Sequence, residues 1–520
     1  MPVARLFRAV IVALALACVG GGAWAQGVPA AGTPAVEVAA AVQGANAGAH
    51  GETHAVPPVW LVLPFVVLLM MVATGQLFYA KHWHRHYPKY AVGLGLLVAA
   101  VYLLGPLGGE PILHAVEEYV SFIALLLALF VASGTILIKT DFAGTPRANA
   151  ALLFCGAVLA NVIGTTGASM LLIRPFMRLN RGRLKAYHIV FFIFIVSNVG
   201  GALTPIGDPP LFLGFLRGVP FFWTVTHLWY IWLPTILLLL AVFYVLDARN
   251  RDESVRERAK VFGDPDVEPG EYTEVETVVH TRRHLAIEGK AGFAWLAVII
   301  AAVFLDPNVM AWVPDLGELA HLPFGVREVV MAGVAVLAYR FARRDVLEQN
   351  HFSFGPIKEV AWLFVGIFLT MVPALELIRS AAADNGELLT ATTFYFGTGL
   401  LSAVLDNAPT YVSFLSAGMG KFGLDVTVPA DVYAFAHVNL SDAQSWYYLQ
   451  AISVGAVFWG AVTYIGNGPN FMVKAIAEEA GVACPSFGGY VWRYALPVLI
   501  PIYTLVWLVF FSGFVPIHTF

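Results

Sequence analysis

The sequence is poor in charge and in cysteine. Charged residues make up only 12% of its 520 residues, whereas soluble domains usually carry about 25%, and hydrophobic residues make up 59%. Of the three cysteines, Cys18 lies in an N-terminal leader, while Cys155 and Cys484 have no CxxC or histidine pattern around them. The composition therefore excludes an ordinary soluble domain, a disulfide framework and a cysteine-based metal site.

Two further absences narrow the function. No basic face or nucleic-acid motif occurs, so we expect no nucleic-acid partner. The G-x-S-x-G, H-E-x-x-H and paired Ser/His patterns of a membrane-embedded hydrolase are also missing, so we expect neither an enzyme nor a cofactor. What the sequence does hold is long apolar stretches with thirteen Trp and thirty-seven Phe. That composition is typical of a chain in a lipid bilayer.

Residues 1–25 have the pattern of a secretory signal peptide. Arg5 and Arg8 precede a short apolar run, three glycines end that run, and an A-W-A cleavage motif follows at 23–25. An uncleaved first transmembrane helix is the alternative, but the apolar run is short for one. Cleavage would leave 26–57, an Ala- and Gly-rich stretch, as a disordered periplasmic tail.

Ten apolar stretches approach the roughly 20 residues that cross a bilayer. They are 59–80, 90–107, 120–138, 188–216, 222–246, 293–313, 329–341, 357–378, 447–477 and 491–514. Lys and Arg concentrate in alternate loops, at 81–89, 139–147, 178–185, 249–283 and 340–344, and Asp and Glu in the others. Basic loops are cytoplasmic by the positive-inside rule. The sequence therefore predicts ten spans in a bacterial cytoplasmic (inner) membrane, with the mature N-terminus and the C-terminus both periplasmic.

Two more apolar stretches, 148–177 and 393–420, do not fit as spans. The first has basic residues at both of its ends, so both ends belong on the cytoplasmic side. It must enter the membrane and return, with its turn at 164–167. The second behaves in the same way from outside, with its turn at 406–409. Re-entrant backbone is tolerated only where protein or a water-filled cavity covers it, so we expect two helical hairpins packed inside the protein.

A ten-residue motif occurs twice in the chain. The run TPIGDPPLFL at 204–213 returns as TYIGNGPNFM at 463–472, with Thr, Ile, Gly, Pro and Phe in register. Each copy interrupts an apolar stretch with residues that cannot continue a helix. Paired helix breaks in corresponding halves indicate the binding site of a secondary transporter.

The order of segments is the same in both halves, but the second half is turned upside down. The predicted fold class is therefore an all-α polytopic membrane protein: an inverted-repeat secondary transporter with two re-entrant hairpins and two broken transmembrane helices. We place the first repeat at 58–247, a charged cytoplasmic linker at 248–290 and the second, inverted repeat at 291–520.

The two hairpin turns and the two breaks should meet around one polar cavity. We expect Asp208 and Asp406 to bind Na⁺ as metal ligands and to exchange it for protons, because an ionised carboxylate at membrane depth is costly unless paired. The alternative is that both residues only cap helices. The supporting candidates are Asn407, Thr204, Thr165, Thr166, Ser169, Asn198, Thr410, Thr463 and Asn467. Arg174 could meet an anionic substrate, but we interpret it as reaching the cytoplasmic headgroups.

At these motifs the chain resembles the ion transporter superfamily, which includes NhaD-type sodium/proton antiporters, arsenite carriers, and citrate and dicarboxylate carriers. The S-x-x-x-D-N-x-P run at 402–409 and the T-P-I-G-D run at 204–208 are similar to the NhaD pattern. The segments 163–169 and 197–201 resemble a bacterial branch assigned to sodium:proton antiport or to citrate transport. The resemblance covers about 120–480.

The chain departs from the dicarboxylate carriers of that superfamily at the hairpin turns. Their Ser-Asn-Thr motif is replaced by Thr-Thr-Gly at 165–167 and by Asp-Asn-Ala at 406–408. This departure counts against a carboxylate cargo.

Two transport mechanisms remain open. In the first, Na⁺ and protons alternate at the two carboxylates, which is sodium/proton antiport. In the second, Na⁺ or protons drive citrate, a dicarboxylate or another oxyanion, held by half-helix N-termini and Thr and Asn side chains. Two midplane acids without a clear midplane Arg or Lys favour antiport. The expected partners are the lipid bilayer and small ions, and a homodimer is left open.

The predicted topology can be tested by cysteine labelling. Ser254 and Ser380 lie in loops that we expect on opposite sides, the first cytoplasmic and the second periplasmic. A membrane-impermeant thiol reagent added outside should therefore label a cysteine at 380 and leave one at 254 unlabelled. The reverse pattern would overturn the whole arrangement.

Overall fold

The computed structural model describes residues 57–140, 144–262, 285–307, 310, 312–314, 316, 322–437, 439–440 and 443–513. The predicted signal peptide, the tail up to residue 56 and Phe520 lie outside the described residues. Most described residues are helical, and among them seven helices are long and apolar enough to cross a membrane. The protein is an all-α multi-pass membrane protein, as its composition predicts.

Helices account for nearly all elements, and prolines in the first turn mark the start of several of them. The first half holds η1 (Val59–Val62), α3 (Leu63–Phe78), α4 (Ala80–Leu104), α5 (Glu110–Gly134), β1 (Leu137–Thr140), α6 (Pro146–Leu179), α7 (Ala186–Ile195), η2 (Val199–Leu203), α8 (Pro209–Leu216) and α9 (Trp223–Phe262). The second half begins with β2 (Leu285–Glu288), α11 (Ala291–Val303), α13 (Val326–Arg340), α14 (Arg344–Gln349), α15 (Gly355–Asp384), η3 (Gly386–Leu388), α16 (Ala391–Val404) and α17 (Asn407–Gly420). It continues with α18 (Pro429–His437), β3 (Asn439–Leu440), β4 (Ala443–Gln444), α19 (Ser445–Trp459), η4 (Gly460–Val462), α20 (Gly468–Glu479), α21 (Phe487–Tyr490), η5 (Val491–Leu499) and α22 (Ile500–Phe510).

Some boundaries differ from those that the sequence predicts. Residues 81–89, expected as a loop, form the first turns of α4, where Pro88 removes only one intrahelical hydrogen bond and Trp83 is buried. The expected linker at 248–290 is partly structured. Good helix formers such as Arg, Glu and Ala continue α9 to Phe262, and β2 pairs antiparallel with β1.

Not every expected span is one long helix. α11 and α13 have only 13 and 15 residues. The two interrupted stretches are divided into α7, η2 and α8, and into α19, η4 and α20. We call these the first and the second broken segment. The number of crossings and the side on which each end lies stay predictions.

α6 is a helical hairpin rather than one straight helix. Gly164 interrupts it with φ 77° and ψ 154°, a conformation restricted almost entirely to glycine. Asn149 and Asn180, near its two ends, exchange side-chain hydrogen bonds of 2.7 and 2.9 Å. Since a straight helix of 34 residues would be about 51 Å long, these ends meet only because the chain reverses. We call this element hairpin 1.

α16 and α17 form a second hairpin, hairpin 2, which turns at Leu405 and Asp406. A Cβ on Gly397 in the first arm would lie 3.0 Å from the ring of Phe414 in the second. Phe394 packs edge-on against the same ring. The two arms therefore lie side by side.

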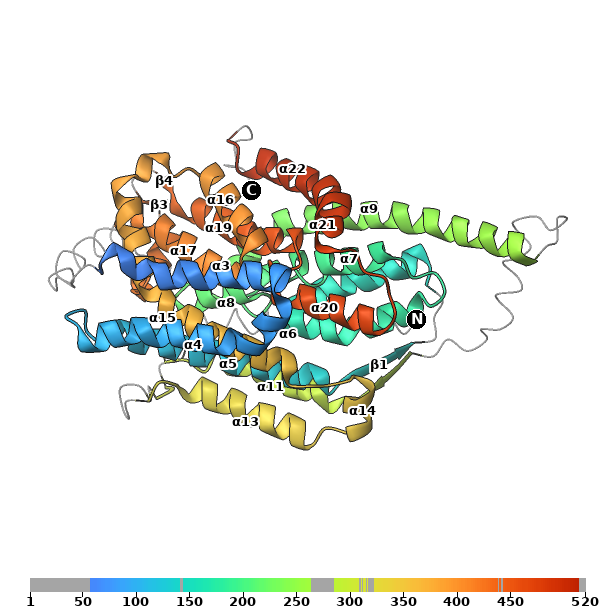
Figure 1. The fold of residues 1–520 in the computed structure, drawn as a ribbon, viewed down its shortest axis with the longest axis horizontal. Coiled ribbons are helices and arrows are strands. Elements are labelled where there is room, and N and C mark those ends of the chain that lie inside the picture. The colour runs from blue at the N-terminus through green and yellow to red at the C-terminus, as the bar shows by residue number, and fades with distance from the viewer. Residues whose placement is uncertain are drawn as a thin grey trace.

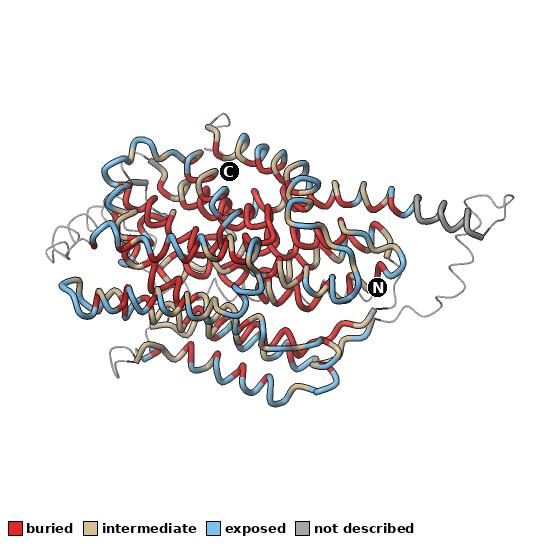
Figure 2. The backbone as a smooth tube through the Cα atoms, in the orientation of Figure 1, coloured by how far each residue is buried: buried red, intermediate tan, exposed pale blue. Residues whose placement is uncertain are grey.

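The helices form two groups that meet at the hairpins. α4, α5, α11, α13 and α15 pack together in the lower part of Figure 1, and α7, α9, α16, α19 and α22 lie above them. Hairpin 1 packs on α5 and the second arm of hairpin 2 packs on α15. Figure 2 shows the buried residues concentrated along this middle zone, where α7 is buried from Tyr187 to Ile195. A helix that is apolar on all sides needs such surroundings.

The two ends of the molecule carry different loops. Figure 1 shows β1, α14 and the C-terminal part of α9 at the right and β3 and β4 at the left. The right-hand segments are those that the positive-inside rule predicts to be cytoplasmic. The long axis of the molecule is therefore the expected direction of the membrane normal.

We expect Gly164→Val to destabilise the fold. A β-branched residue is strained at this backbone conformation, at a cost of about 1–3 kcal/mol, and its Cβ would lie 3.3 Å from the Ile206 carbonyl oxygen. Gly93→Ala is the control, because a Cβ there meets nothing within 4 Å and alanine favours a helix. Thermal unfolding of the purified variants should separate them, and equal melting temperatures would contradict the turn at Gly164.

Candidate functional site

The two copies of the repeated motif have the same backbone conformation. In the first broken segment, Thr204 (φ −138°, ψ 155°) and Asp208 (φ −141°, ψ 143°) are extended. In the second, Thr463 (φ −133°, ψ 168°) and Asn467 (φ −155°, ψ 139°) match them. A proline in the first helical turn then starts the next helix in each copy. The sequence repeat is therefore also a structural repeat.

The two threonines make equivalent contacts. Thr204 Oγ1 donates to the Asn161 carbonyl oxygen at 2.5 Å and accepts from the Gly207 N–H at 3.1 Å. Thr463 Oγ1 donates to the Ala403 carbonyl oxygen at 2.6 Å and accepts from the corresponding glycine N–H at 3.2 Å. Asn161 belongs to hairpin 1 and Ala403 to hairpin 2. Each threonine thus ties a broken segment to the hairpin of its own half.

Asp208 lies where the four breaks meet. Its Oδ1 accepts hydrogen bonds from the Thr165 hydroxyl at 2.8 Å and from Asn467 Nδ2 at 2.9 Å. Its Oδ2 accepts from Asn407 Nδ2 at 2.6 Å. These donors come from hairpin 1, the second broken segment and hairpin 2, and all four side chains are at most 2% exposed. One carboxylate therefore joins both halves of the chain.

The charge of Asp208 has no cationic partner in the described part of the chain. Its three donors are a hydroxyl and two amides, and no described Lys or Arg lies within ion-pair distance. Its side chain also makes no capping hydrogen bond to α8. The capping alternative therefore does not describe the contacts of Asp208.

Asp406, which the sequence ranks beside Asp208, has a different place. It is half-buried, and its carboxylate accepts from the Ala408 N–H at 3.0 Å, which caps α17. It lines the same cavity as Asp208, but no hydrogen bond between described residues joins the two carboxylates. Asp406 is thus a helix cap with one face toward the cavity, and Asp208 alone holds the centre.

The remaining candidates lie at different distances from this centre. Thr166 lines the cavity beside Thr165. Ser169 Oγ lies 2.7 Å from Ser197 Oγ, deeper in the protein. Thr410 donates to the Asp406 carbonyl oxygen at 2.9 Å, so its hydroxyl serves its own helix.

Asn470 is an oxygen-bearing residue of the second break that the sequence does offer, but it is not among the predicted site residues, and the structure makes it central. Its Nδ2 donates to the carbonyl oxygens of Gly460 and Thr463, both at 2.9 Å, and its Oδ1 accepts from Asn198 Nδ2 at 2.7 Å. Its side chain joins Gly460 and Thr463 of the second broken segment and connects this segment to Asn198 of the first. The signal for this role in the sequence is a polar residue, Asn470, at the position that Leu211 occupies in the first copy of the motif.

Two buried amide oxygens near the breaks, those of Asn407 and Asn198, have no hydrogen-bond partner among the described residues. Asn407 must turn its NH₂ toward the carboxylate, which can only accept, so its Oδ1 is left free. Asn198 must offer its NH₂ to Asn470, because the NH₂ of Asn470 is committed to two carbonyls, so Asn198 Oδ1 is free as well. A Cβ on Gly460 would lie 3.0 Å from Asn198 Oδ1 and 3.5 Å from Asn407 Nδ2. Free oxygens near a carboxylate suit a hard cation.

A cavity of about 620 Å³ reaches this site. Its wall combines Asp208, Asp406 and the turn of hairpin 1 with apolar side chains of α5 and α15, including Phe122 and Phe364. Arg174, on the second arm of hairpin 1, also lines it. Arg174 is half-buried and faces this cavity, and its predicted contact with the cytoplasmic headgroups stays a prediction.

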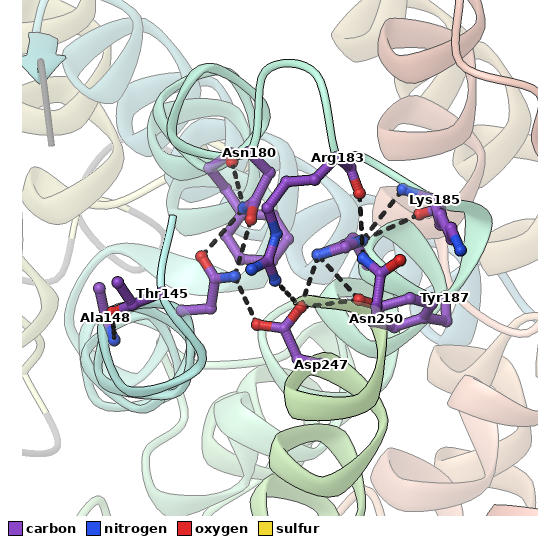
Figure 3. A network of polar contacts seen from close by, with 11 residues as sticks. Thr145, Ala148, Asn180, Arg183, Lys185, Tyr187, Asp247 and Asn250 are labelled. Atoms are coloured by element: carbon purple, nitrogen blue, oxygen red, sulfur yellow. Dashed lines mark hydrogen bonds and ion pairs between the residues drawn. The ribbon is translucent and has the colours of Figure 1, made fainter. Parts of the chain in front are cut away.

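A second buried polar network closes the base of hairpin 1 (Figure 3). Asp247 of α9 accepts from the Tyr187 hydroxyl at 2.7 Å, from His188 Nε2 at 3.0 Å and from Asn149 Nδ2 at 2.8 Å, and it pairs with Arg183. These residues join hairpin 1, α7 and α9. Because four donors satisfy one carboxylate, we interpret this network as structural.

A family model described as "Putative citrate transport" matches residues 53–511. The chain belongs to this citrate transport family. The matched residues include both hairpins, both broken segments and every side chain that contacts Asp208. This match shows that the protein is a membrane transporter. Its place in the NhaD-type branch, which the motifs suggest, stays an expectation.

Curated relatives are transporters and a membrane protein of mycobacteria. An uncharacterized transporter of Mycobacterium tuberculosis is 25% identical over 352 residues, which cover 65% of this chain and 71% of the relative. The 46 kDa membrane protein of Mycobacterium leprae is 26% identical over 350 residues, which cover 65% of this chain and 71% of the relative. The names of these relatives give no cargo.

We expect Asn470→Leu, which copies the residue of the first motif, to destabilise the protein. The Gly460 and Thr463 carbonyls would lose their Asn470 donor, and Asn198 would keep only the Ile193 carbonyl as an acceptor. Each buried polar group left unpaired costs about 1–3 kcal/mol. Asn385→Leu is the control, because its exposed amide donates only to the Ala381 carbonyl at 2.9 Å. Chemical or thermal denaturation of both variants measures the difference, and similar losses would show that the buried network contributes little.

Proposed function

We propose that this member of the citrate transport family is a secondary active transporter that exchanges Na⁺ for protons at Asp208. The proposal includes a bacterial cytoplasmic membrane location, both mature termini in the periplasm and no enzymatic activity. The observation that carries it is the Asp208 carboxylate, which is buried and hydrogen-bonded from all three other breaks without a cationic side chain. A bound Na⁺ or a proton removes the cost of an unpaired buried charge.

The free amide oxygens supply the remaining ligands. Na⁺ needs several oxygens once its water is removed, and neutral carbonyl-type oxygens complement one carboxylate. Asn407 Oδ1 and Asn198 Oδ1 are buried acceptors without a donor. Asp406, on the cavity wall, adds a second negative charge along the path. Protonation of Asp208 and Na⁺ binding exclude each other at one carboxylate, which is the basis of exchange.

The matched halves support alternating access. The ion site is built from both hairpins and both broken segments, so an ion cannot leave without changing contacts in each. Inverted repeats with broken helices at the midplane are typical of transporters that open first to one side and then to the other. We infer that the hairpins are re-entrant from opposite sides, as the charges at their ends predict.

Symport of citrate or a similar oxyanion is the second candidate. The family description favours it, and so does the cavity, whose volume of about 620 Å³ lies in the range of roughly 300–1,000 Å³ typical of small organic ligands. A bare ion needs far less room. In this scheme, Asp208 binds the coupling ion and the anion occupies the wider part of the cavity.

We expect Asp208→Asn to abolish Na⁺-dependent proton movement while the protein still folds. The substituted amide presents one NH₂, and Asn407 can rotate its free Oδ1 to accept from it, so the packing survives and only the charge is lost. Asp406→Asn keeps the helix cap. Because Asp406 lies at the cavity wall and not at the centre, this variant should weaken exchange rather than abolish it. Flux of ²²Na⁺ and pH-sensitive dye signals in proteoliposomes measure both variants.

Competition gives a second readout in the wild type. The apparent Na⁺ affinity should weaken as pH falls, by up to about tenfold per pH unit for one-for-one competition. If the Asp208→Asn variant exchanges Na⁺ for protons as fast as the wild type does, antiport at this residue is ruled out. Proton uptake that requires citrate, with no Na⁺ flux in its absence, would instead favour the symporter.

A further inference from the structure

A second cavity, which we call the vestibule, opens beside the first. It has a volume of about 870 Å³ and lies between the loop that joins α6 to α7 and the C-terminal end of α20. Arg174, His351, Ile476 and Glu479 line both the vestibule and the central cavity. The vestibule is therefore the mouth of the cavity that leads to Asp208.

The vestibule wall is strongly basic. It carries Arg174, Arg178, Arg181 and Lys185, while Glu479 is the one acidic residue among its described lining. No ion pair within the described residues involves any of the three arginines, and Nη1 of Arg174 is buried without a hydrogen-bond partner. Elsewhere in the same loop, Arg183 is paired with Asp247 (Figure 3). The vestibule arginines thus lack the close ion pair that Arg183 has, and Arg174 has Glu479 only as a more distant charged neighbour.

We propose that the vestibule binds a small, soluble, multiply charged anion, a carboxylate or a phosphate, with Arg174 as its inner anchor. A guanidinium offers a planar fork of donors that matches a carboxylate or phosphate, and an anion would satisfy the free Nη1 of Arg174. The exposed Arg178 and Arg181 raise the positive potential at the mouth and concentrate anions there. By the positive-inside rule, the anion comes from the cytoplasm.

This anion site is distinct from the cation site. Arg174 lies ten residues beyond the turn at Gly164, which is about 15 Å along a helix. Anion binding does not rest on the proposed function, but its effect on Na⁺ does. A positive mouth opposes Na⁺ entry, so an anion in the vestibule should raise the apparent Na⁺ affinity at Asp208, and Na⁺ should raise anion affinity by the same factor.

Calorimetry on purified protein in neutral, lipid-free detergent tests the site directly. Citrate and inorganic phosphate should bind, and monovalent gluconate should bind much more weakly. Arg174→Gln should weaken binding at least tenfold. Arg340→Gln is the matched control, because Arg340 is an exposed arginine at the end of α13, outside the vestibule, and it should bind as the wild type does.

Two additional variants keep the test decisive. If Arg174→Gln does not fold, the exposed pair Arg178→Gln and Arg181→Gln should still lower anion affinity severalfold. Asp208→Asn should retain anion binding, so failure of the antiport proposal and failure of this one give different results. The proposal is overturned if no multivalent anion binds, if Arg174→Gln binds as the wild type does, or if a water-soluble phosphatidylglycerol binds while the free anions do not.

Discussion

The hydrogen bonds to the Asp208 carboxylate are the constraint on which the central arrangement depends. A carboxylate can only accept, so it dictates that Thr165, Asn407 and Asn467 all turn donors toward it. That choice leaves Asn407 Oδ1 without a partner. The same contact thus joins the four breaks and creates both an unpaired negative charge and a free oxygen. The rigidity of the site around Asp208 and the cation binding proposed for it would therefore have one origin.

The turns and breaks were predictable because their signals are local. Gly164, the proline after Asp208 and the charges that flank each hairpin act within a few residues, and they predict where a helix must end. The repeated motif predicted two similar breaks, and the matching backbone angles of Thr204 and Thr463 agree with that. The correspondence of the two whole halves stays a prediction. Segment 81–89 shows the limit of this reasoning. Its basic residues indicated a loop, but the segment is helical and its Trp83 is buried.

The ranking of side chains within the site was not predictable, because it depends on contacts between distant segments. Asp208 and Asp406 both precede a helix start and look alike in sequence, yet only Asp406 caps its helix. Asp208 is instead joined to Asn407 and Asn467, 199 and 259 residues away. Asn470 was omitted from the predicted site for the same reason.

Charge along the path to Asp208 changes sign, and this order has a functional consequence. A cation approaching from the vestibule meets Arg174 and its neighbours before it reaches Asp208 and Asp406. Unit charges about 15 Å apart interact by about 1 kcal/mol at an effective dielectric constant of about 20. Arg174 therefore opposes Na⁺ binding at the proposed site by an amount comparable with one hydrogen bond. The exposed Arg178 and Arg181 lie farther from the turn and are screened by solvent, so they oppose it less. A transporter of bare Na⁺ would gain from removing these charges, whereas one that admits an anion together with the cation would gain from keeping them.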